Sequence, residues 1–366
     1  MKLKVERQEL VDRLANIQNV VEKRNTMPVL SHFLLEAGKD GSRISATDIE
    51  TAIREPIKVE VESEGMLCIP ARKLFEIVKE IKGDVEITIA SEDSQWIRVS
   101  AGKSSFRLAC LSPDEFPSWP SMEEPVEVKL DPSVLESLIE RTLYSAGESD
   151  TRYTLNGLLF HMQGQNLTVV GTDGHRMALI NTELGGAVSK ELKVIVPRKT
   201  ASEIRKFLNI EGEITMTVGT NHVLFTIGEV EFLARLIEGT YPNYSQVIPT
   251  GNDKLVTMKR TDMISALKLV SVMSRERSNA VKADLEPSVI KLSSNNPDLG
   301  EASDEVAVTY DGDELSMGFN AKYLLDVLQA MGSEDVTLEM KDQLSPTLIK
   351  EAGNDNYKCV VMPMRI

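Results

Sequence analysis

The sequence predicts an α+β fold built from three repeated domains, each with two helices on mostly antiparallel sheets. Three observations lead to this fold class. The chain has 366 residues, which exceeds the usual length of one domain. Similar segments recur three times along it, and a recurring segment usually marks a recurring structural unit. Between the amphipathic segments lie short runs of alternating, β-branched residues, such as "VEITIA" (85–90), "WIRVSA" (96–101) and "NLTVVG" (166–171).

Each repeat is expected to begin with a short strand and an amphipathic helix. The opening segments are "KLKVERQELVDRLANIQNVV" (2–21), "EVKLDPSVLESLIERTLYSA" (127–146) and "LVTMKRTDMISALKLVSVMS" (255–274). In the middle segment the spacing of one helical face is found at Leu135, Leu138, Ile139 and Leu143. Asp131 is a favourable N-cap, and Pro132 follows it in the first turn. We expect helices over 6–24, 131–146 and 259–275.

A second helix follows later in each repeat, between two strands and before an acidic turn. The corresponding segments are "CIPARKLFEIVKEIKGDVEITI" (68–89), "IVPRKTASEIRKFLNIEGEITMTV" (195–218) and "MGFNAKYLLDVLQAMGSEDVTLEM" (317–340). They predict helices over 70–82, 197–209 and 320–331.

The ends of the first two repeats also match, because "FRLACLSPDEFPSWP" (106–120) corresponds to "FLARLIEGTYPNYSQVIP" (232–249). Both segments close with an aromatic-proline turn. The linkers that follow are "SMEEPVE" (121–127) and "TGND" (250–253). We therefore expect domains at 1–120, 128–249 and 253–366.

One loop of the middle repeat, "GTDGHRMAL" (171–179), resembles the mouth of an active site. The first repeat has "SATDIETAI" (45–53) at the same place, with the Thr-Asp pair but neither the histidine nor the arginine. The shared pair is most simply a turn in which the side chains bond their own backbone. His175 and Arg176 need a separate explanation, and catalysis in the 171–180 loop is one hypothesis.

The composition argues against several other chemistries. The four histidines and three cysteines show no spacing typical of a metal site, and neither a phosphate-binding loop nor a nucleophile elbow is present in the sequence. We predict no catalytic residue, no metal and no cofactor. The few, scattered cysteines are typical of a reducing cytosol, and no apolar run is long enough for a signal or a membrane span. We therefore expect a cytoplasmic protein that makes no membrane contact.

The charge is unevenly distributed between helices and the rest of the chain. The net charge is −15, yet "PARKLFEIVKEIK" (70–82), "PRKTASEIRKFLN" (197–209) and "KRTDMISALKLVSVMSR" (259–275) each carry four basic residues against one or two acidic ones. Such helices can be ordinary solvated faces. Alternatively, they line one shared surface that attracts phosphate weakly and without sequence preference.

The motifs together resemble the bacterial DNA polymerase III β subunit family, the sliding clamps. The most specific are "NTMPVLSHFLLEA" (25–37), "TDGHRMAL" (172–179), "GTYPNY" (239–244), "SRERSNAVK" (274–282) and "VVMPMRI" (360–366). The resemblance covers essentially the whole chain. It implies a non-catalytic processivity factor, cytoplasmic and associated with the nucleoid, in which a head-to-tail homodimer forms a ring of six domains around double-stranded DNA.

The same resemblance implies the partners. They are the polymerase III alpha subunit, the delta subunit of the clamp loader, and other polymerases and repair proteins that carry clamp-binding peptides. A repeat-built scaffold that binds proteins but never encircles DNA remains the alternative.

The resemblance also implies three sets of residues. DNA contacts are expected at Arg24, Lys73 and Tyr153, with Arg198 and Arg205 on the basic helix 197–209. The dimer seam is expected at Phe106, Arg107, Leu108, Val272, Met273, Glu301 and Asp304. The partner-peptide pocket is expected at Arg152, Leu155, Thr172, Gly174, His175, Arg176, Met177, Pro242, Val247, Val360, Met362, Pro363, Met364 and Arg365.

Each set has a plainer interpretation. Phe106 can be an ordinary core residue, and the C-terminal tail can be a buried last strand that lines no pocket. Gln246 and Pro346 differ from residues common in the family, so the preference for a peptide motif does not carry over. Ser149 is shorter than its usual counterpart, so we expect no DNA contact from that position.

Overall fold

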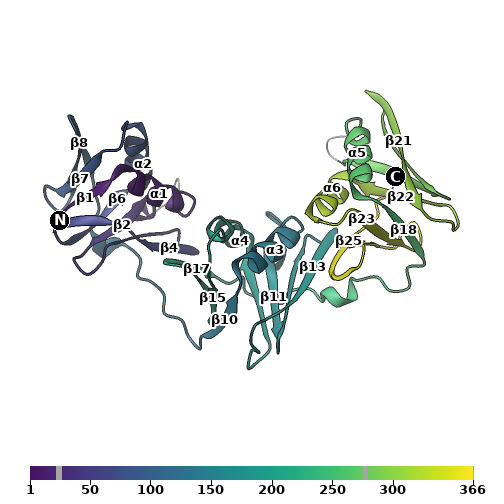
Figure 1. Ribbon diagram of the computed structural model, residues 1–366, viewed down its shortest axis with the longest axis horizontal. Helices are drawn as coiled ribbons and strands as arrows, with labels where there is room; N and C mark the ends of the chain where they lie inside the picture. Colours follow the sequence, from purple (N-terminus) through teal and green to yellow (C-terminus); the bar gives the residue numbers. More distant parts are fainter. Residues whose placement is uncertain (22–26, 275–277, 366) are drawn as a thin grey trace. The chain divides into compact units, whose positions relative to one another are not determined.

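The computed structural model describes residues 1–21, 27–274 and 278–365. Within it the chain forms two compact units. The first unit comprises residues 1–132 and 206–236, and the second comprises residues 133–205 and 237–366. The middle repeat therefore contributes to both units. Figure 1 shows the course of the chain through its helices and strands, coloured along the sequence.

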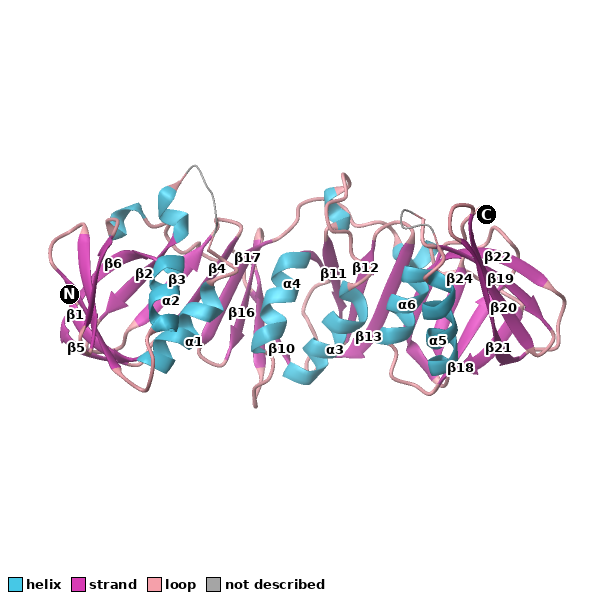
Figure 2. Cartoon of the chain, turned by 90° about the horizontal axis from the view of Figure 1, so that it is seen from above, coloured by secondary structure: helices cyan, strands magenta, loops and turns pink. Residues whose placement is uncertain are grey.

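The first unit contains two sheets and two helices. The five-stranded sheet has the order β5-β1-β7-β8-β9, with β1 (Lys2–Glu6), β5 (Val59–Ser63), β7 (Glu86–Ser91), β8 (Trp96–Ala101) and β9 (Ser104–Ala109). The eight-stranded sheet has the order β10-β15-β16-β17-β4-β3-β2-β6, with β2 (His32–Ala37), β3 (Arg43–Thr47), β4 (Thr51–Pro56), β6 (Gly65–Pro70), β10 (Val126–Leu130), β15 (Ile214–Val218), β16 (His222–Ile227) and β17 (Val230–Arg235). Helices α1 (Arg7–Ile17) and α2 (Ala71–Glu80) lie side by side over these strands (Figure 2).

The second unit contains one twelve-stranded sheet. Its order is β14-β11-β12-β13-β25-β24-β23-β18-β21-β20-β19-β22. The bounds are β11 (Gly157–Gln163), β12 (Asn166–Thr172), β13 (Arg176–Glu183), β14 (Leu192–Pro197), β18 (Lys254–Lys259), β19 (Ala280–Glu286), β20 (Val289–Asn296), β21 (Gly300–Thr309), β22 (Leu315–Asn320), β23 (Asp335–Met340), β24 (Thr347–Glu351) and β25 (Asn354–Val361). Figure 2 shows the helices of this unit in front of its strands; they are α3 (Pro132–Leu143), α4 (Arg198–Ile204), α5 (Arg260–Ser271) and α6 (Ala321–Ala330).

Short 3-10 turns complete the secondary structure. They are η1 (Pro28–Ser31), η2 (Pro113–Glu115), η3 (Tyr153–Leu155), η4 (Arg205–Phe207) and η5 (Tyr244–Gln246). All pairings between the described strands are antiparallel, as the sequence predicts; β13 with β25 and β17 with β4 are two examples. Because these two pairings join strands of different repeats, neighbouring repeats share continuous sheets. The domain boundaries drawn from the sequence stay a prediction.

Each helix lies within the segment predicted for it but is shorter than that segment, most clearly α1 and α4. Of the described residues 6–21, those from Arg7 to Ile17 form the helix, and after it Val20 and Val21 both donate their backbone N–H to the carbonyl of Ile17 in a turn. Their side chains are buried in that turn. The segment 197–209 is α-helical to Ile204 and continues as the tighter η4.

An arginine at the start of one helix caps the end of its neighbour in every repeat. Arg7 of α1 bonds the end of α2, Arg260 of α5 bonds the end of α6, and Arg198 of α4 bonds the end of α3. The acceptors are the carbonyls of Val78 and Lys79, of Leu328 and Ser333, and of Leu143 and Ala146. The last turn of a helix presents carbonyls without intrahelical partners, and a cation there also favours the helix dipole. The repeat therefore preserves a capping device together with its helix pair.

Candidate functional site

The Thr-Asp pair forms the same turn in the first and middle repeats. Thr172 Oγ1 donates to the carbonyl of Arg176 at 2.6 Å, and Thr47 Oγ1 donates to the carbonyl of Thr51 at 2.8 Å. The carboxylate of Asp173 accepts the N–H of Arg176 at 3.0 Å, and Asp48 accepts the N–H of Thr51 at 2.6 Å. The structural interpretation of this pair is therefore confirmed. The Asp173 carboxylate is occupied in holding the backbone.

The two turns differ at the residue that follows the aspartate. The backbone φ is +83° at Gly174 and +79° at Ile49, in the left-handed region that glycine adopts without strain. A Cβ at position 174 would lie 2.7 Å from a guanidinium nitrogen of Arg152. That guanidinium donates to the carbonyl of Asp173 at 2.9 Å and to the carboxylate of Asp150, and this ion pair lowers the pKa of Asp150 to about 2. Glycine at 174 therefore lets Arg152 close over the turn.

Arg176, the second residue without a counterpart in the first repeat, is buried. Its Nε donates to Asp173 at 3.1 Å, its Nη1 to Asp326 of α6 at 2.6 Å, and its Nη2 to the carbonyl of Tyr144 at 2.6 Å. The guanidinium also lies 4.5 Å from the ring centroid of Tyr323 and 5.5 Å from that of Tyr144. Its donors point into the protein, so Arg176 supports the turn from behind.

His175, in contrast, is exposed and lies beside the C-terminal strand. Its carbonyl accepts the N–H of Met362 at 2.9 Å, and its ring stacks with that of Tyr323 at 6.4 Å between centroids. Burial raises the pKa of the Tyr323 phenol. Met362 is 38% exposed and therefore accessible beside the histidine. Two residues further on, the N–H of Met364 donates to the carbonyl of Gly318 at 2.8 Å.

The apolar residues predicted for the pocket lie behind this edge. Met177 pairs with Val360 across β13 and β25, and both side chains are buried with Tyr241 and Leu348 in one cluster. The remaining predicted residues are Thr172 and Leu155, both buried, Pro242, Val247, Gly174 and Arg365, all exposed, and the half-buried Pro363. The structure thus brings Arg152, His175, Met177, Val360 and Met362 together around the 172–176 turn and the end of β25, and the role of the whole set as a pocket stays a prediction. The tail is both a last strand and part of this surface.

Three further residues at this site were not predicted from the sequence. Tyr323 and Asp326 lie on α6, and Tyr144 follows α3. Tyr144 also reaches Cys359, with its hydroxyl 3.2 Å from the sulfur. The only sequence signal was the position of Tyr323 in the second helix of the third repeat, which has no special spacing. We define the partner surface as Gly174, His175, Met362 and the residues that hold them.

The residues predicted to contact DNA have mixed environments. Arg24 lies outside the described residues. Tyr153 is 76% exposed, and Lys73 is exposed on α2. Arg205 is half exposed and pairs with Glu140 at 3.0 Å. Arg198 is half-buried as the cap of α3 described above, so part of its hydrogen-bonding capacity is already used.

The residues predicted for a dimer seam lie on β9, after α5 and on β21. Leu108 is buried, and Phe106 lines a cavity of about 530 Å³ next to α2. Arg107 pairs with Glu92 at 2.7 Å and covers the ring of Trp96. Val272 is 74% exposed, Met273 lies next to Gly300, and Glu301 and Asp304 are exposed and half exposed along β21.

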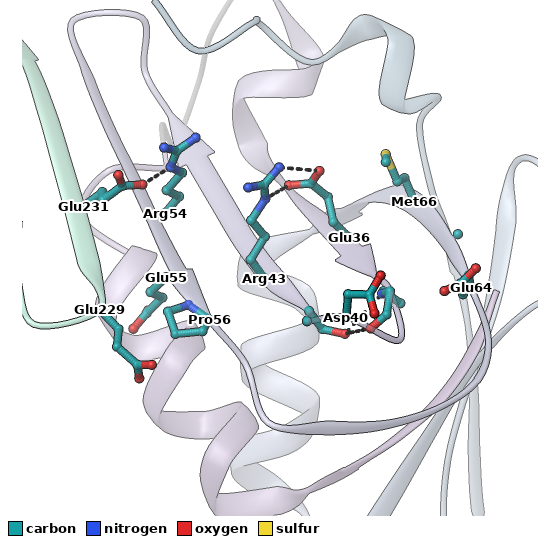
Figure 3. A pocket seen from close by; sticks show the side chains of 15 residues that line it. Glu36, Asp40, Arg43, Arg54, Glu55, Pro56, Glu64, Met66, Glu229 and Glu231 are labelled. Atoms are coloured by element: carbon teal, nitrogen blue, oxygen red, sulfur yellow. Dashed lines mark hydrogen bonds and ion pairs between the residues drawn. The ribbon is translucent and has the colours of Figure 1, made fainter.

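The largest cavity described in the first unit lies away from all these residues. It measures about 890 Å³, and its lining residues come from β2, β3, β4, β6 and β17 and the loops between them. Figure 3 shows its arginines paired within the lining, Arg43 with Glu36 and Arg54 with Glu231. In the second unit, a cavity of about 460 Å³ includes Pro242 and the pair His161–Tyr244.

Two other kinds of site are absent from the part of the chain that the structure describes. No group of His, Cys, Asp and Glu there could hold a metal ion. No helix there is long and apolar enough to cross a membrane.

Comparison with known proteins places the chain in one family along its whole length. Three profiles match: the N-terminal domain of the DNA polymerase III beta subunit over residues 1–120, the central domain over 129–243 and the C-terminal domain over 245–365. The proteins named beta sliding clamp of Pseudomonas putida and Escherichia coli K12 are 37% and 32% identical to the chain, with full coverage of both chains.

Solved structures agree with this assignment. The crystal structure of the DNA polymerase III subunit beta from Pseudomonas aeruginosa superposes with a TM-score of 0.95 at 36% identity, and 100% of each chain is covered. The Caulobacter crescentus beta sliding clamp, with polyethylene glycol in its putative beta-motif tethering region, also gives 0.95 at 35% identity and full coverage. The chain therefore belongs to the DNA polymerase III beta subunit family.

Proposed function

We propose that this protein is a DNA polymerase processivity factor, a sliding clamp that encircles duplex DNA and tethers replication proteins to it. The observation that carries the proposal is the match of all three clamp domains over the entire chain. A clamp need not grip DNA tightly, because a closed ring is retained by topology. A chain with net charge −15 is compatible with this, since attraction to phosphate is needed only at the helices.

Two open sheet edges support assembly into a ring. β9 is the terminal strand of its sheet, and β21 pairs with β20 along most of its length but with β18 only at Val308 and Thr309. An exposed strand edge leaves N–H and C=O groups that another strand can pair with. Pairing of β9 from one protomer with β21 from another would satisfy both edges. The contact is head-to-tail and closes after two copies.

The partner surface is the proposed docking place for clamp-binding peptides. Met362 offers a flexible apolar contact, and His175 offers an exposed imidazole beside it. We propose that the polymerase III alpha subunit, the delta subunit of the clamp loader, and other polymerases and repair proteins bind here in turn.

We also propose that the chain catalyses no reaction, works in the cytoplasm at the nucleoid and depends on another protein to open the ring. Support for the first point comes from the 171–180 loop. Asp173 is bonded to its own backbone and Arg176 is buried among carboxylates and carbonyls, so neither is poised for proton transfer.

A processivity assay tests the proposal. Polymerase III core from the same organism extends a primer on a long single-stranded template in this assay. It should add many more nucleotides per binding event when the chain and its clamp loader are present. The matched control is the chain with His175→Ala and Met362→Ala, which should lose the effect while remaining dimeric by sedimentation. Product lengths unchanged by the wild-type chain would contradict the proposal.

A further inference from the structure

The turn at residues 172–176 does not need Arg176 in order to form. In the first repeat Thr51 occupies the equivalent position, and Asp48 bonds both its N–H and its hydroxyl. Even the contact with the following strand recurs, because the N–H of Arg235 bonds the carbonyl of Glu50 at 2.8 Å as Met362 bonds His175. The first repeat is thus an internal control, and it shows that the arginine serves another purpose.

That purpose is visible in what Arg176 connects. One of its carboxylate partners, Asp173, belongs to the turn itself, whereas the other, Asp326, lies on α6 in the third repeat. The side chain of Arg176 is 9% exposed, so its charge is compensated by these two groups more than by water. The guanidinium therefore fastens the turn of the middle repeat to a helix of the third.

The same helix carries the other neighbour of the exposed histidine. Tyr323 lies one helical turn before Asp326, where i and i+3 side chains share a face. Its ring stacks on His175 and also contacts the guanidinium of Arg176. A shift of Arg176 relative to α6 would thus change the position of His175 against Tyr323 and, through the His175 carbonyl, the position of Met362.

We propose that Asp326 is a positioning residue of the partner surface, which fixes His175 and Met362 through Arg176 without touching the bound peptide. The inference rests on the proposed function, because it assumes that partner peptides bind at this surface. It predicts that a partly exposed carboxylate on α6 controls peptide affinity from behind the surface.

The experiment measures the affinity and dissociation rate of a fluorescein-labelled peptide that copies the clamp-binding segment of the organism's polymerase III alpha subunit. Asp326→Asn keeps the size and one acceptor but removes the charge, and it should weaken binding by about 3- to 30-fold, mostly through faster dissociation. Asp326→Glu should restore much of the affinity. Glu334→Gln, which removes an exposed carboxylate paired with Lys259 in the same repeat, is the matched control and should bind normally.

A double mutant separates positioning from a general loss of stability. If Asp326 acts through Arg176, then Asp326→Asn should have no further effect in an Arg176→Met background. Two results would overturn this inference but leave the proposed partner surface intact. One is that the losses of peptide affinity caused by Asp326→Asn and Arg176→Met multiply in the double mutant. The other is that Asp326→Asn binds the peptide normally while His175→Ala binds it weakly. Normal binding by both Asp326→Asn and His175→Ala would overturn the proposed partner surface and this inference with it. Thermal unfolding of each dimer verifies that the variants are folded.

Discussion

At the scale of single residues, position 174 depends on the absence of a side chain. The backbone there has a φ of +83°, and the guanidinium of Arg152 occupies the space that a Cβ would need. At the equivalent position of the first repeat, Ile49 adopts a φ of +79° and is 54% exposed. A β-branched residue pays for that conformation with strain. The two positions therefore predict opposite outcomes for substitution.

Gly174→Ala should lower the free energy of unfolding by about 1–2 kcal/mol, because it introduces a left-handed alanine and displaces Arg152. Ile49→Gly should raise it by about 0.5–1 kcal/mol, because relief of strain exceeds the added entropy of the unfolded chain. Chemical denaturation of the two variants and the wild type measures both. If Ile49→Gly instead had a lower free energy of unfolding than the wild type, the turn would not be strained at Ile49.

The buried thiols make the stability sensitive to alkaline pH. Burial raises the pKa of Cys68 to about 12 and those of Cys110 and Cys359 to about 11, from an ordinary value of 9.0. Below pH 9 the thiols are mostly protonated in both the folded and the unfolded chain, so they do not make the free energy of unfolding depend on pH. Between pH 9 and these raised values only the unfolded chain loses its protons, so stability falls as the pH rises.

Cys68→Ala should therefore lose less stability than the wild type between pH 8 and pH 11. Urea denaturation at several pH values provides the comparison, and the difference between the two chains at pH 8 accounts for the change in packing. Parallel curves over this range would mean that the Cys68 thiol ionises in the folded state as easily as in the unfolded one.

What the sequence could reveal at this scale depended on the repeat. The Thr-Asp turn was predictable, because two copies share the pair and only one carries His175 and Arg176. The partner of Arg176 was not predictable. Asp326 lies far along the chain in a helix with ordinary spacing, and it comes close to Arg176 because the middle and third repeats pack together, with β13 paired to β25.

At the scale of elements, the arginine caps explain why the repeat keeps a basic residue at the start of one helix in each pair. Arg260 donates to the carbonyls of Ser333 at 2.8 Å and Leu328 at 3.2 Å at the end of α6. The sequence shows Arg198 and Arg260 only as part of basic helices, and Arg7 only as one of several charged residues in the segment 6–24. Capping could not be read from it, because the acceptors belong to a helix that is distant in sequence.

Arg260→Ala should lower the free energy of unfolding by about 1–2 kcal/mol, because it removes charge-assisted bonds to otherwise unpaired carbonyls. Arg205→Ala is the comparison. Its pair with Glu140 is exposed on both sides, so its loss should cost less than about 1 kcal/mol. Thermal and urea unfolding rank the two variants, and a larger cost for Arg205→Ala would contradict the capping assignment.

The basic helices also illustrate the limits of composition. All six expected helices are present, and their apolar faces placed them correctly to within a turn or two. The charge count could not say which cations already have partners. Arg198 caps α3, Arg205 pairs with Glu140, and the exposed Lys73 pairs with Glu76 of its own helix.

At the scale of the whole molecule, the account depends on closure of a ring. The chain has a mass of 40.6 kDa, so sedimentation equilibrium should give a mass of twice that value for the ring. The three-repeat fold class followed from internal similarity alone. The sharing of sheets between repeats did not, because strand pairing across repeats leaves no local pattern in the sequence.

The most direct test of the central claim is the retention of the protein on DNA of different topology. The chain is loaded by its clamp loader onto a nicked circular plasmid and separated from free protein by gel filtration, before and after the plasmid is cut once by a restriction enzyme. We predict retention on the circle and rapid loss from the linear form, at a salt concentration that suppresses simple electrostatic binding. Equal retention on both forms, or equal loss from both, would contradict encirclement.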